Sequence, residues 1–337
     1  MRLLVREKDK RLSFPQELCY TVKNVRAARG QRRRTDFWGD FMTRQRKAEL
    51  LLILATAFWG VSYYLTDVCF AELEPLMLNA IRFTVAFLVL GAAVLPRIRR
   101  AGRATWRYSV LLGLVLTVVY LCATYGVKYT SLSNAGFLST LVAVFTPLLQ
   151  WIVYRKVPER KARIALALCV IGLALLSLNE KFLPAGGDVL CLMCSVSYAV
   201  DILIMERAVV DPAVDPIALG VLELGVVGLA MLGLALLFEQ PRLPRSAPVW
   251  AAALFLALFC SGISFLIQAS EQRYTSATRV SLIFTLEPVF AALVAFFVAG
   301  ERLRPRGYLG AALMLASLLT MEIDWENLKG GKRYDDV

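Results

Sequence analysis

Histidine is absent from the 337 residues of this chain. Its absence excludes the Ser-His-Asp and Cys-His arrangements of hydrolases, zinc sites with histidine ligands, and histidine proton relays. A glycine-rich phosphate loop of the Walker type is also missing, so nothing in the sequence indicates ATP-driven work by this chain alone. Neither a resident metal nor a cofactor is expected, and the sequence does not predict an enzyme.

Cysteine is present, but not in a pattern that predicts disulfides or a metal site. The seven cysteines are scattered, and six of them lie in or at the ends of apolar segments. Cys191 and Cys194 have the spacing of a redox or zinc motif, but they lie inside an apolar segment without a second ligand pair. We expect this pair to be packing residues.

Charged residues are also scarce. Only 19% of the residues are Asp, Glu, Lys or Arg, whereas 58% are hydrophobic and the mean hydropathy is +0.59. Ten apolar segments of about 17–25 residues are each long enough to cross a hydrocarbon core of about 30 Å as a helix. The segments are 48–68, 76–95, 108–127, 133–154, 162–178, 187–206, 216–238, 248–270, 276–299 and 306–323. The chain is therefore predicted to be an all-α integral membrane protein in contact with the lipid bilayer.

The ten segments form two copies of a five-helix unit, at 48–178 and 187–323. Pro75 and Pro216, which open the second segment of each copy, are 141 residues apart. Pro147 and Pro288, in the fourth segments, differ by the same interval. Because five is odd, the second copy enters the bilayer from the opposite side, which predicts ten transmembrane helices as two inverted five-helix repeats.

Basic residues predict the orientation in the membrane. Residues 1–47 form a basic N-terminal extension, whose first 41 residues contain 11 Lys and Arg against 5 Asp and Glu. We expect this extension to be disordered, its residues 1–41 to be dispensable, and no nucleic acid to bind to it. The loops after the second and fourth segments are also basic, so the positive-inside rule places the N-terminus in the cytoplasm. Ten crossings return the tail, residues 324–337, to the same side, although the charge bias of the second half is nearly flat.

Several motifs resemble EamA-type proteins of the drug/metabolite transporter superfamily. They are Ala57-Phe58-Trp59-Gly60, Arg82, Lys128-Tyr129-Thr130-Ser131-Leu132-Ser133-Asn134-Ala135, Leu286-Glu287-Pro288-Val289-Phe290 and Gly300-Glu301-Arg302-Leu303. The resemblance covers about residues 48–323. It implies ten helices, cytoplasmic termini, and transport of small metabolites across the inner (plasma) membrane. One departure is that Thr146 occupies the first-half position that corresponds to Glu287.

Ionisable groups inside apolar segments are the first candidates for function, because they are costly in a bilayer unless they face protein or water. Arg82 and Glu223 occupy corresponding positions of the two halves, so they could form a structural or gating pair with each other or with other interior groups. Asp201 corresponds to Ser62 and is our candidate for proton coupling or for binding a substrate amine. Glu287 precedes Pro288 and could bind a cation or support a helix kink.

Aromatic and amide side chains complete the predicted binding site. Trp59 and Tyr198 correspond between the first helices of the two halves, and Tyr63 lies one turn beyond Trp59 on the same face. The candidate substrate-binding residues are Trp59, Tyr63, Tyr120, Asn134, Tyr198, Asp201 and Gln268; the candidates for coupling or structure are Arg82, Glu223, Glu287, Pro147 and Pro288. Ring faces and amide groups suit a small uncharged or zwitterionic solute. Each of these residues could also be a packing residue.

The sequence therefore predicts a secondary transporter, in the first place an exporter, for a small metabolite such as an amino acid. Alternating access is the expected mechanism, driven by protons or by the solute gradient. A passive facilitator, an integral-membrane enzyme and a receptor-like scaffold are the alternatives. A homo-oligomer is also left open.

Overall fold

The computed structural model describes residues 34–129, 138–155, 158–177, 186–299 and 305–322. Residues 1–45 and residues 46–337 form two separate units. In the first unit the described part, residues 34–45, is helical, although we expected it to belong to a disordered extension. Arg, Gln, Lys, Ala and Glu around residues 44–49 all have high helix propensity, which favours continuing the membrane helix in the N-terminal direction.

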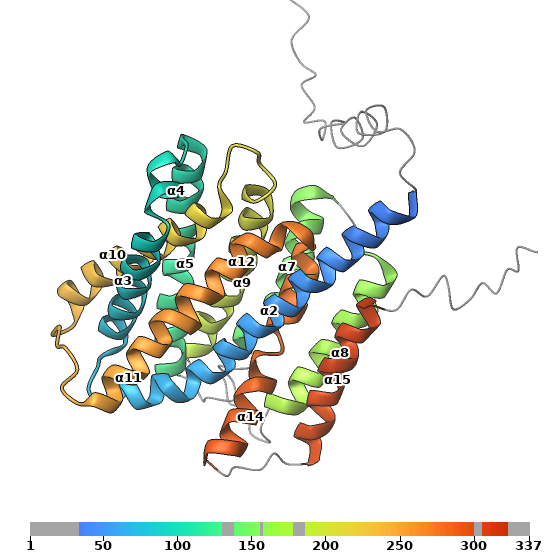
Figure 1. Cartoon of the computed structure of the whole chain (residues 1–337). Helices are drawn as coiled ribbons and strands as arrows, with labels where there is room; N and C mark the ends of the chain where they lie inside the picture. Colours follow the sequence, from blue (N-terminus) through green and yellow to red (C-terminus); the bar gives the residue numbers. More distant parts are fainter. Residues whose placement is uncertain (1–33, 130–137, 156–157, 178–185, 300–304, 323–337) are drawn as a thin grey trace, which may run out of the picture. The chain divides into compact units, whose positions relative to one another are not determined.

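The described residues form helices and turns without a β-strand (Figure 1). The elements are α2 (Arg34–Phe70), α3 (Pro75–Ala93), α4 (Leu95–Arg100), α5 (Arg103–Tyr129), α7 (Val142–Tyr154), α8 (Arg160–Ser177), α9 (Gly186–Ala208), α10 (Pro216–Phe238), α11 (Ala247–Phe255), the π-helix η1 (Leu256–Ile263), α12 (Ser264–Glu271), the 3₁₀ turn η2 (Gln272–Tyr274), α13 (Ala277–Phe284), α14 (Glu287–Ala299) and α15 (Pro305–Glu322).

Seven stretches of the described residues are long and apolar enough to cross a membrane. They are Arg44–Phe70, Pro75–Ala93, Arg103–Gly126, Gly186–Ala208, Pro216–Phe238, Ala247–Tyr274 and Ala277–Val298. The expectation of an all-helical, multi-pass membrane protein is confirmed. The apolar helix α7 is shorter, with 13 residues, and α8 and α15 have 18 residues each.

Two of the seven stretches are not regular α-helices. The π-helix η1 interrupts the stretch that begins with α11, and there the Ser264 N–H donates to the carbonyl of Phe259, five residues earlier. In the last stretch, α13 ends at Phe284 and α14 begins at Glu287. Pro288 therefore lies in the first turn of α14, where its missing N–H is tolerated. Pro147 lies inside α7.

Long helices pack in pairs within the second unit. α8 packs along α15, α5 along α9, and α10 along both α3 and α5 (Figure 1). Helices in a bilayer approach closely where small residues line the contact. At Gly172 of α8, a Cβ atom would lie 2.7 Å from the carbonyl oxygen of Gly310 in α15. The two backbones thus meet where neither residue has a side chain.

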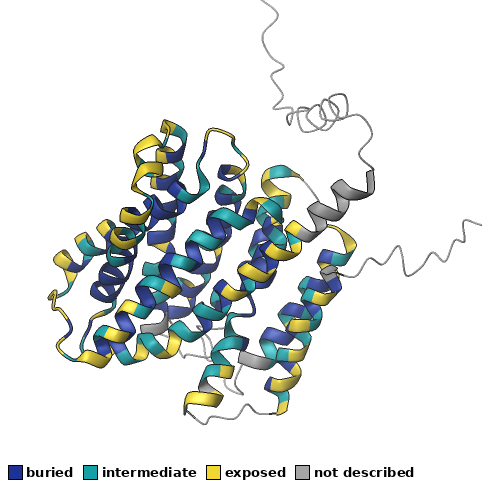
Figure 2. Ribbon diagram, in the orientation of Figure 1, coloured by how far each residue is buried: buried dark blue, intermediate teal, exposed yellow. Residues whose placement is uncertain are grey.

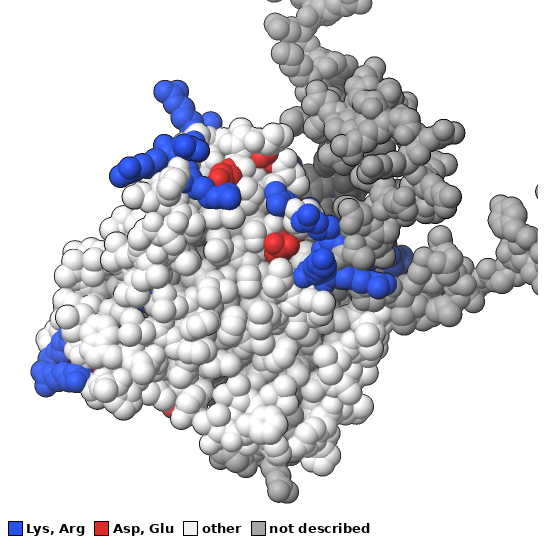
Figure 3. Space-filling model, in the orientation of Figure 1, with Lys and Arg blue, Asp and Glu red and all other residues white. Residues whose placement is uncertain are grey.

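Buried residues and charged residues are both unevenly distributed over the second unit. Figure 2 shows buried positions on the helix faces that meet other helices and exposed positions on the opposite faces. The exposed faces include large apolar side chains such as Phe297, Leu237 and Leu229, which are 78%, 76% and 70% exposed. In Figure 3 a broad surface of the second unit is free of charge, and Lys and Arg gather at its margins. This is the surface expected of a protein surrounded by lipid.

Candidate functional site

An aromatic group surrounds Trp59 in the buried core of the second unit. The indole N–H of Trp59, on α2, donates to the Cys260 carbonyl of η1 at 2.8 Å. The Trp59 ring lies 4.7 Å from Phe284, 5.6 Å from Phe265 and 6.2 Å from Tyr198, measured between ring centroids. Four segments of the chain thus contribute one ring each, and Trp59 is only 4% exposed.

The π-helix supplies polar contacts to this group. The Cys260 carbonyl accepts hydrogen bonds from two side chains, the Trp59 indole and the Arg82 Nη2 at 3.4 Å. Arg82 Nε donates to the Ser261 hydroxyl. Single π-turns occur often at functional sites, because they change which backbone groups are available for such contacts.

Arg82, on α3, is a buried cation held by neutral groups. Besides Ser261 and Cys260, it contacts the Tyr120 hydroxyl through Nη2 at 3.4 Å, and its Cζ lies 5.2 Å from the centre of the Tyr120 ring. Its exposed fraction is 5%. Glu223 is not among its contacts, so the two corresponding charges do not form an ion pair within the described residues.

Tyr63 and Glu287 are two candidate residues that are less buried than Trp59 and Arg82. Tyr63 on α2 is 38% exposed, and its hydroxyl is near enough to Glu287, Cys194 and Tyr120, on three other helices, to interact with them electrostatically. Glu287 is half-buried, interacts with Arg82, and begins α14 immediately after the break.

Asp201, Glu223 and Gln268 form a second, fully enclosed group. Each is 0% exposed, and their side-chain oxygen and nitrogen atoms have no hydrogen-bond partner in the described part of the chain. Because Asp201 has no exposed surface, a substrate does not reach it in this conformation. Tyr198 interacts with both Asp201 and Glu287, and so connects the two groups.

The structure thus brings together most of the residues selected from the sequence. Trp59, Tyr63, Tyr120, Tyr198, Arg82 and Glu287 lie around one site, while Asp201, Glu223 and Gln268 lie in the enclosed group. Asn134 is outside the described residues. Sequence reasoning missed Phe265, Phe284 and Ser261, since nothing distinguishes them from other apolar or small residues until the helices are packed.

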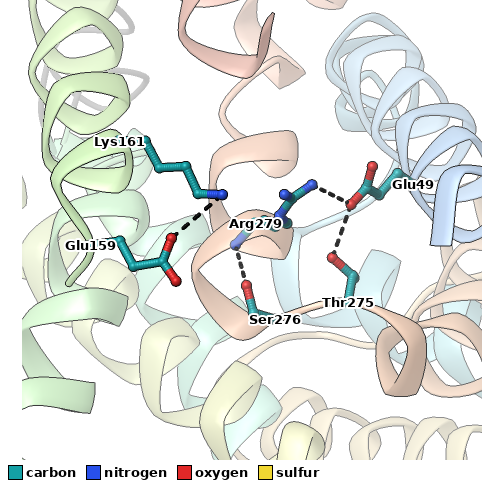
Figure 4. A network of polar contacts seen from close by, with 6 residues as sticks. All are labelled: Glu49, Glu159, Lys161, Thr275, Ser276 and Arg279. Carbon is teal, nitrogen blue, oxygen red and sulfur yellow. Dashed lines mark hydrogen bonds and ion pairs between the residues drawn. The ribbon is translucent and has the colours of Figure 1, made fainter. Parts of the chain in front are cut away.

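Polar contacts at the helix ends join segments from the two halves of the sequence. At one end, Arg279 Nη1 on α13 pairs with Glu49 Oε1 on α2 at 2.9 Å, and the Thr275 hydroxyl donates to the same oxygen (Figure 4). Lys161 and Glu159, in the same view, form a local pair at 3.5 Å.

Further contacts of this kind involve the ends of other helices. Arg97 Nη1 lies 3.5 Å from Asp215 Oδ2, which joins α4 to the start of α10. The carboxylate of Glu239, after α10, accepts from the Leu76 and Met77 N–H groups at 2.9 and 2.8 Å. The Glu239 carboxylate thus satisfies two backbone N–H groups in the first turn of α3, which have no acceptor within the helix.

The chain also resembles known proteins over most of its length. The sequence profile of the EamA-like transporter family matches residues 46–178 and again residues 185–322. An uncharacterized transporter of Archaeoglobus fulgidus is 25% identical over 278 residues, which cover 82% of this chain and 86% of the relative. The uncharacterized transporter YetK of Bacillus subtilis is 22% identical over an aligned region that spans 85% of this chain and 89% of YetK. A solved crystal structure has a TM-score of 0.73 at 17% identity, covers 85% of this chain and 99% of its own, and is similar in fold alone.

Proposed function

The chain belongs to the EamA-like transporter family, and on that premise we propose that this membrane transporter moves a small zwitterionic metabolite across the inner membrane by alternating access. Amino acids and related compounds are the proposed substrate class, and export is the proposed direction. Both termini are proposed to be cytoplasmic, from the charge of the first half of the sequence.

The arrangement of ten helices as two inverted repeats is part of the proposal. The family profile matches the chain twice, at 46–178 and 185–322, which supports a duplication. Helices at corresponding positions of the two halves also pack on each other: α3 on α10, and α8 on α15. Contacts between corresponding helices are expected if a two-fold axis in the membrane plane relates the two repeats.

The observation that carries the substrate class is the group of charged and aromatic side chains around Trp59. A carboxylate (Glu287), a guanidinium group (Arg82) and the rings of Trp59 and Tyr198 belong to this group. A zwitterion with an apolar or aromatic side chain matches these groups, with its amine toward Glu287 and its carboxylate toward Arg82. The ring faces would contact the apolar part of the solute.

Alternating access requires that contacts at the two ends of the helices open in turn. Glu49–Arg279 and Arg97–Asp215 join the two halves at one end, and Glu239 with the start of α3 joins them at the other. Breaking one set while keeping the other would expose the site to one side only. Coupling to protons is proposed to involve Asp201.

Counterflow in proteoliposomes tests the proposal. Vesicles loaded with one unlabelled amino acid should accumulate the same labelled compound transiently, for some members of a panel of amino acids. Tyr63→Ala should abolish this counterflow, whereas Tyr64→Ala on the same helix should leave it intact. Absence of counterflow for every amino acid and related metabolite, in folded wild-type protein, would reject this substrate class.

The nearest alternative is a passive facilitator with the same fold. It would show the same counterflow, but a pH gradient would not drive accumulation against a concentration gradient. Measuring uptake with and without an imposed pH gradient separates the two functions.

A further inference from the structure

The enclosed group contains two carboxyl groups that the substrate site does not use. Asp201 is on α9 and Glu223 on α10, and both are 0% exposed. None of their four carboxylate oxygens accepts a hydrogen bond from the described residues. Buried carboxylates are ordinarily paired with cations or hydrogen-bond donors, so this pair lacks an expected partner.

Contacts between the helices α9, α10 and α12 independently bring the residues of the enclosed group together. A Cβ atom at Gly220 of α10 would lie 2.9 Å from the Cβ of Ala269, so α10 and α12 touch there. Glu223 is three residues from Gly220, on the same helix face, and Gln268 directly precedes Ala269. One turn beyond Gln268, Gln272 Nε2 donates to the carbonyl of Ile202, the residue after Asp201, at 2.7 Å.

Gln268 provides a second indication of a missing partner. Its side chain is 0% exposed, and neither Oε1 nor Nε2 has a hydrogen-bond partner among the described residues, although it interacts with Asp201. Gln272 Oε1 is likewise without a partner. A neutral amide can donate to one carboxyl oxygen and accept from a protonated one, so it suits a carboxyl pair that changes its proton count.

We propose that Asp201 and Glu223 form a proton-binding carboxyl pair, oriented by Gln268, that is the coupling site of the transporter. Two carboxylates without a cation between them repel each other strongly in a low-dielectric interior, so the pair retains one proton. Taking up a second proton neutralises the pair, and releasing it restores the single negative charge. The proton comes from, and returns to, water on whichever side the site is open.

The pair is placed to influence the substrate site. Tyr198 on α9 interacts with Asp201, Glu223, Tyr120 and Glu287, and it stacks on Phe284 at 5.9 Å. These are the titratable groups around the pair, and Arg82 lies beyond Tyr120 and Glu287. A change in the charge of the pair therefore acts on Tyr198, whose ring borders the site. This coupling role, unlike the proton binding itself, rests on the proposed transport function.

Infrared difference titration of the purified protein tests the proton site without any substrate. Subtracting the Asp201→Asn/Glu223→Gln double variant should leave a protonated-carboxyl band that appears in two steps, separated by more than about one pH unit. Each single variant should show one step. The exchanged variant Asp201→Glu/Glu223→Asp should retain two, and so should Asp211→Asn, a control in the exposed turn after α9.

Two results would overturn the proton pair. One is a single variant that keeps both steps. The other is suppression of the band by Na⁺ but not by choline at equal ionic strength, which would make the group a metal-cation site.

Transport then tests the coupling role separately. In the double variant, counterflow should continue, while the ratio of uptake with and without a pH gradient falls to one. An undiminished ratio would contradict the coupling role. If wild-type protein shows no counterflow but titrates in two steps, the proposed transport function fails and the proton site stands.

Discussion

Arg82 illustrates at the scale of one residue why a buried charge in a membrane protein need not have a counter-ion directly beside it. Its guanidinium group has three polar partners, Ser261, Cys260 and Tyr120, and a ring face at 5.2 Å. Each of these hydrogen-bond partners is neutral, and Glu287 acts on the positive charge only electrostatically. In the proposed function this charge binds an anionic group of the substrate.

The first prediction concerns the geometry of Arg82. Lysine keeps the charge but cannot reach several acceptors in a fixed plane. Because a charge-assisted hydrogen bond contributes about 1.5–3 kcal/mol, Arg82→Lys should weaken substrate binding at least about tenfold in a proteoliposome binding assay. Arg99→Lys, at an exposed position of α4, is the control and should bind substrate normally. Equal affinity of Arg82→Lys and wild type would contradict the role of the guanidinium fork.

Glu72, in the short loop between α2 and α3, supports a prediction about pH. Hydrogen bonds from the Ser246 hydroxyl and from the Arg245 and Ser246 N–H groups, at 2.6 and 3.2 Å for the N–H groups, hold the pKa of Glu72 below its ordinary value. A carboxylate with a lowered pKa in the folded state stabilises the protein above its unfolded pKa of about 4.3. That contribution is lost as the pH falls through the folded pKa.

Thermal unfolding in detergent between about pH 3 and pH 7 measures this contribution. Wild-type protein should lose melting temperature on acidification, and Glu72→Gln should be less stable than wild type at pH 7 but should converge with it at low pH. If the melting temperatures of wild type and Glu72→Gln differ by the same amount at every pH in this range, Glu72 makes no such contribution.

At the scale of the element, close packing depends on positions without side chains. In the bilayer, lipid tails are as apolar as leucine, so the helices associate mainly through close backbone approach and not through burial of apolar surface. α8 and α15 meet at Gly172, and α5 meets Val226 of α10 at Gly113. Larger residues at these positions would force the helices apart.

The corresponding prediction compares two glycines. Gly172→Leu would bring its side chain against Gly310 and Met314, and overpacking of this kind costs about 1–3 kcal/mol or more. We expect a lower yield of monodisperse protein and a lower melting temperature. Gly233→Leu is the control, because nothing lies within 4 Å of the Cβ position there. An equal loss of yield and melting temperature in both variants would show that the helix propensity of the new residue, and not packing, is responsible.

At the scale of the whole molecule, the proposed inverted-repeat arrangement predicts which loops share a side of the membrane. Cysteines introduced at Arg100 and Arg160, in a background without the seven native cysteines, should react with impermeant reagents from the cytoplasmic side only. Cysteines at Arg242 and Pro244 should react from outside, despite the arginines in that loop. If Arg242 and Arg160 are labelled from the same side, the two halves are not inverted.

Composition and the spacing of apolar segments were sufficient to predict the class of this protein. Helices of membrane length follow from local residue type alone, since every backbone donor in a bilayer needs a partner within its own segment. The family resemblance rested on short local motifs and is confirmed by the profile match. Trp59, Arg82 and Glu287 could be selected because intramembrane charges and corresponding aromatics stand out in the sequence.

Only the tertiary structure decided which of these groups meet. Arg82 and Glu223 occupy corresponding positions in the sequence, yet Arg82 contacts the π-helix while Glu223 lies with Asp201. Phe265 and Phe284 join Trp59 through the packing of segments far apart in the chain. Helical periodicity determines the face on which a residue lies, but the partner of that face depends on how the helices pack, and many sequences of the same pattern are compatible with different packings.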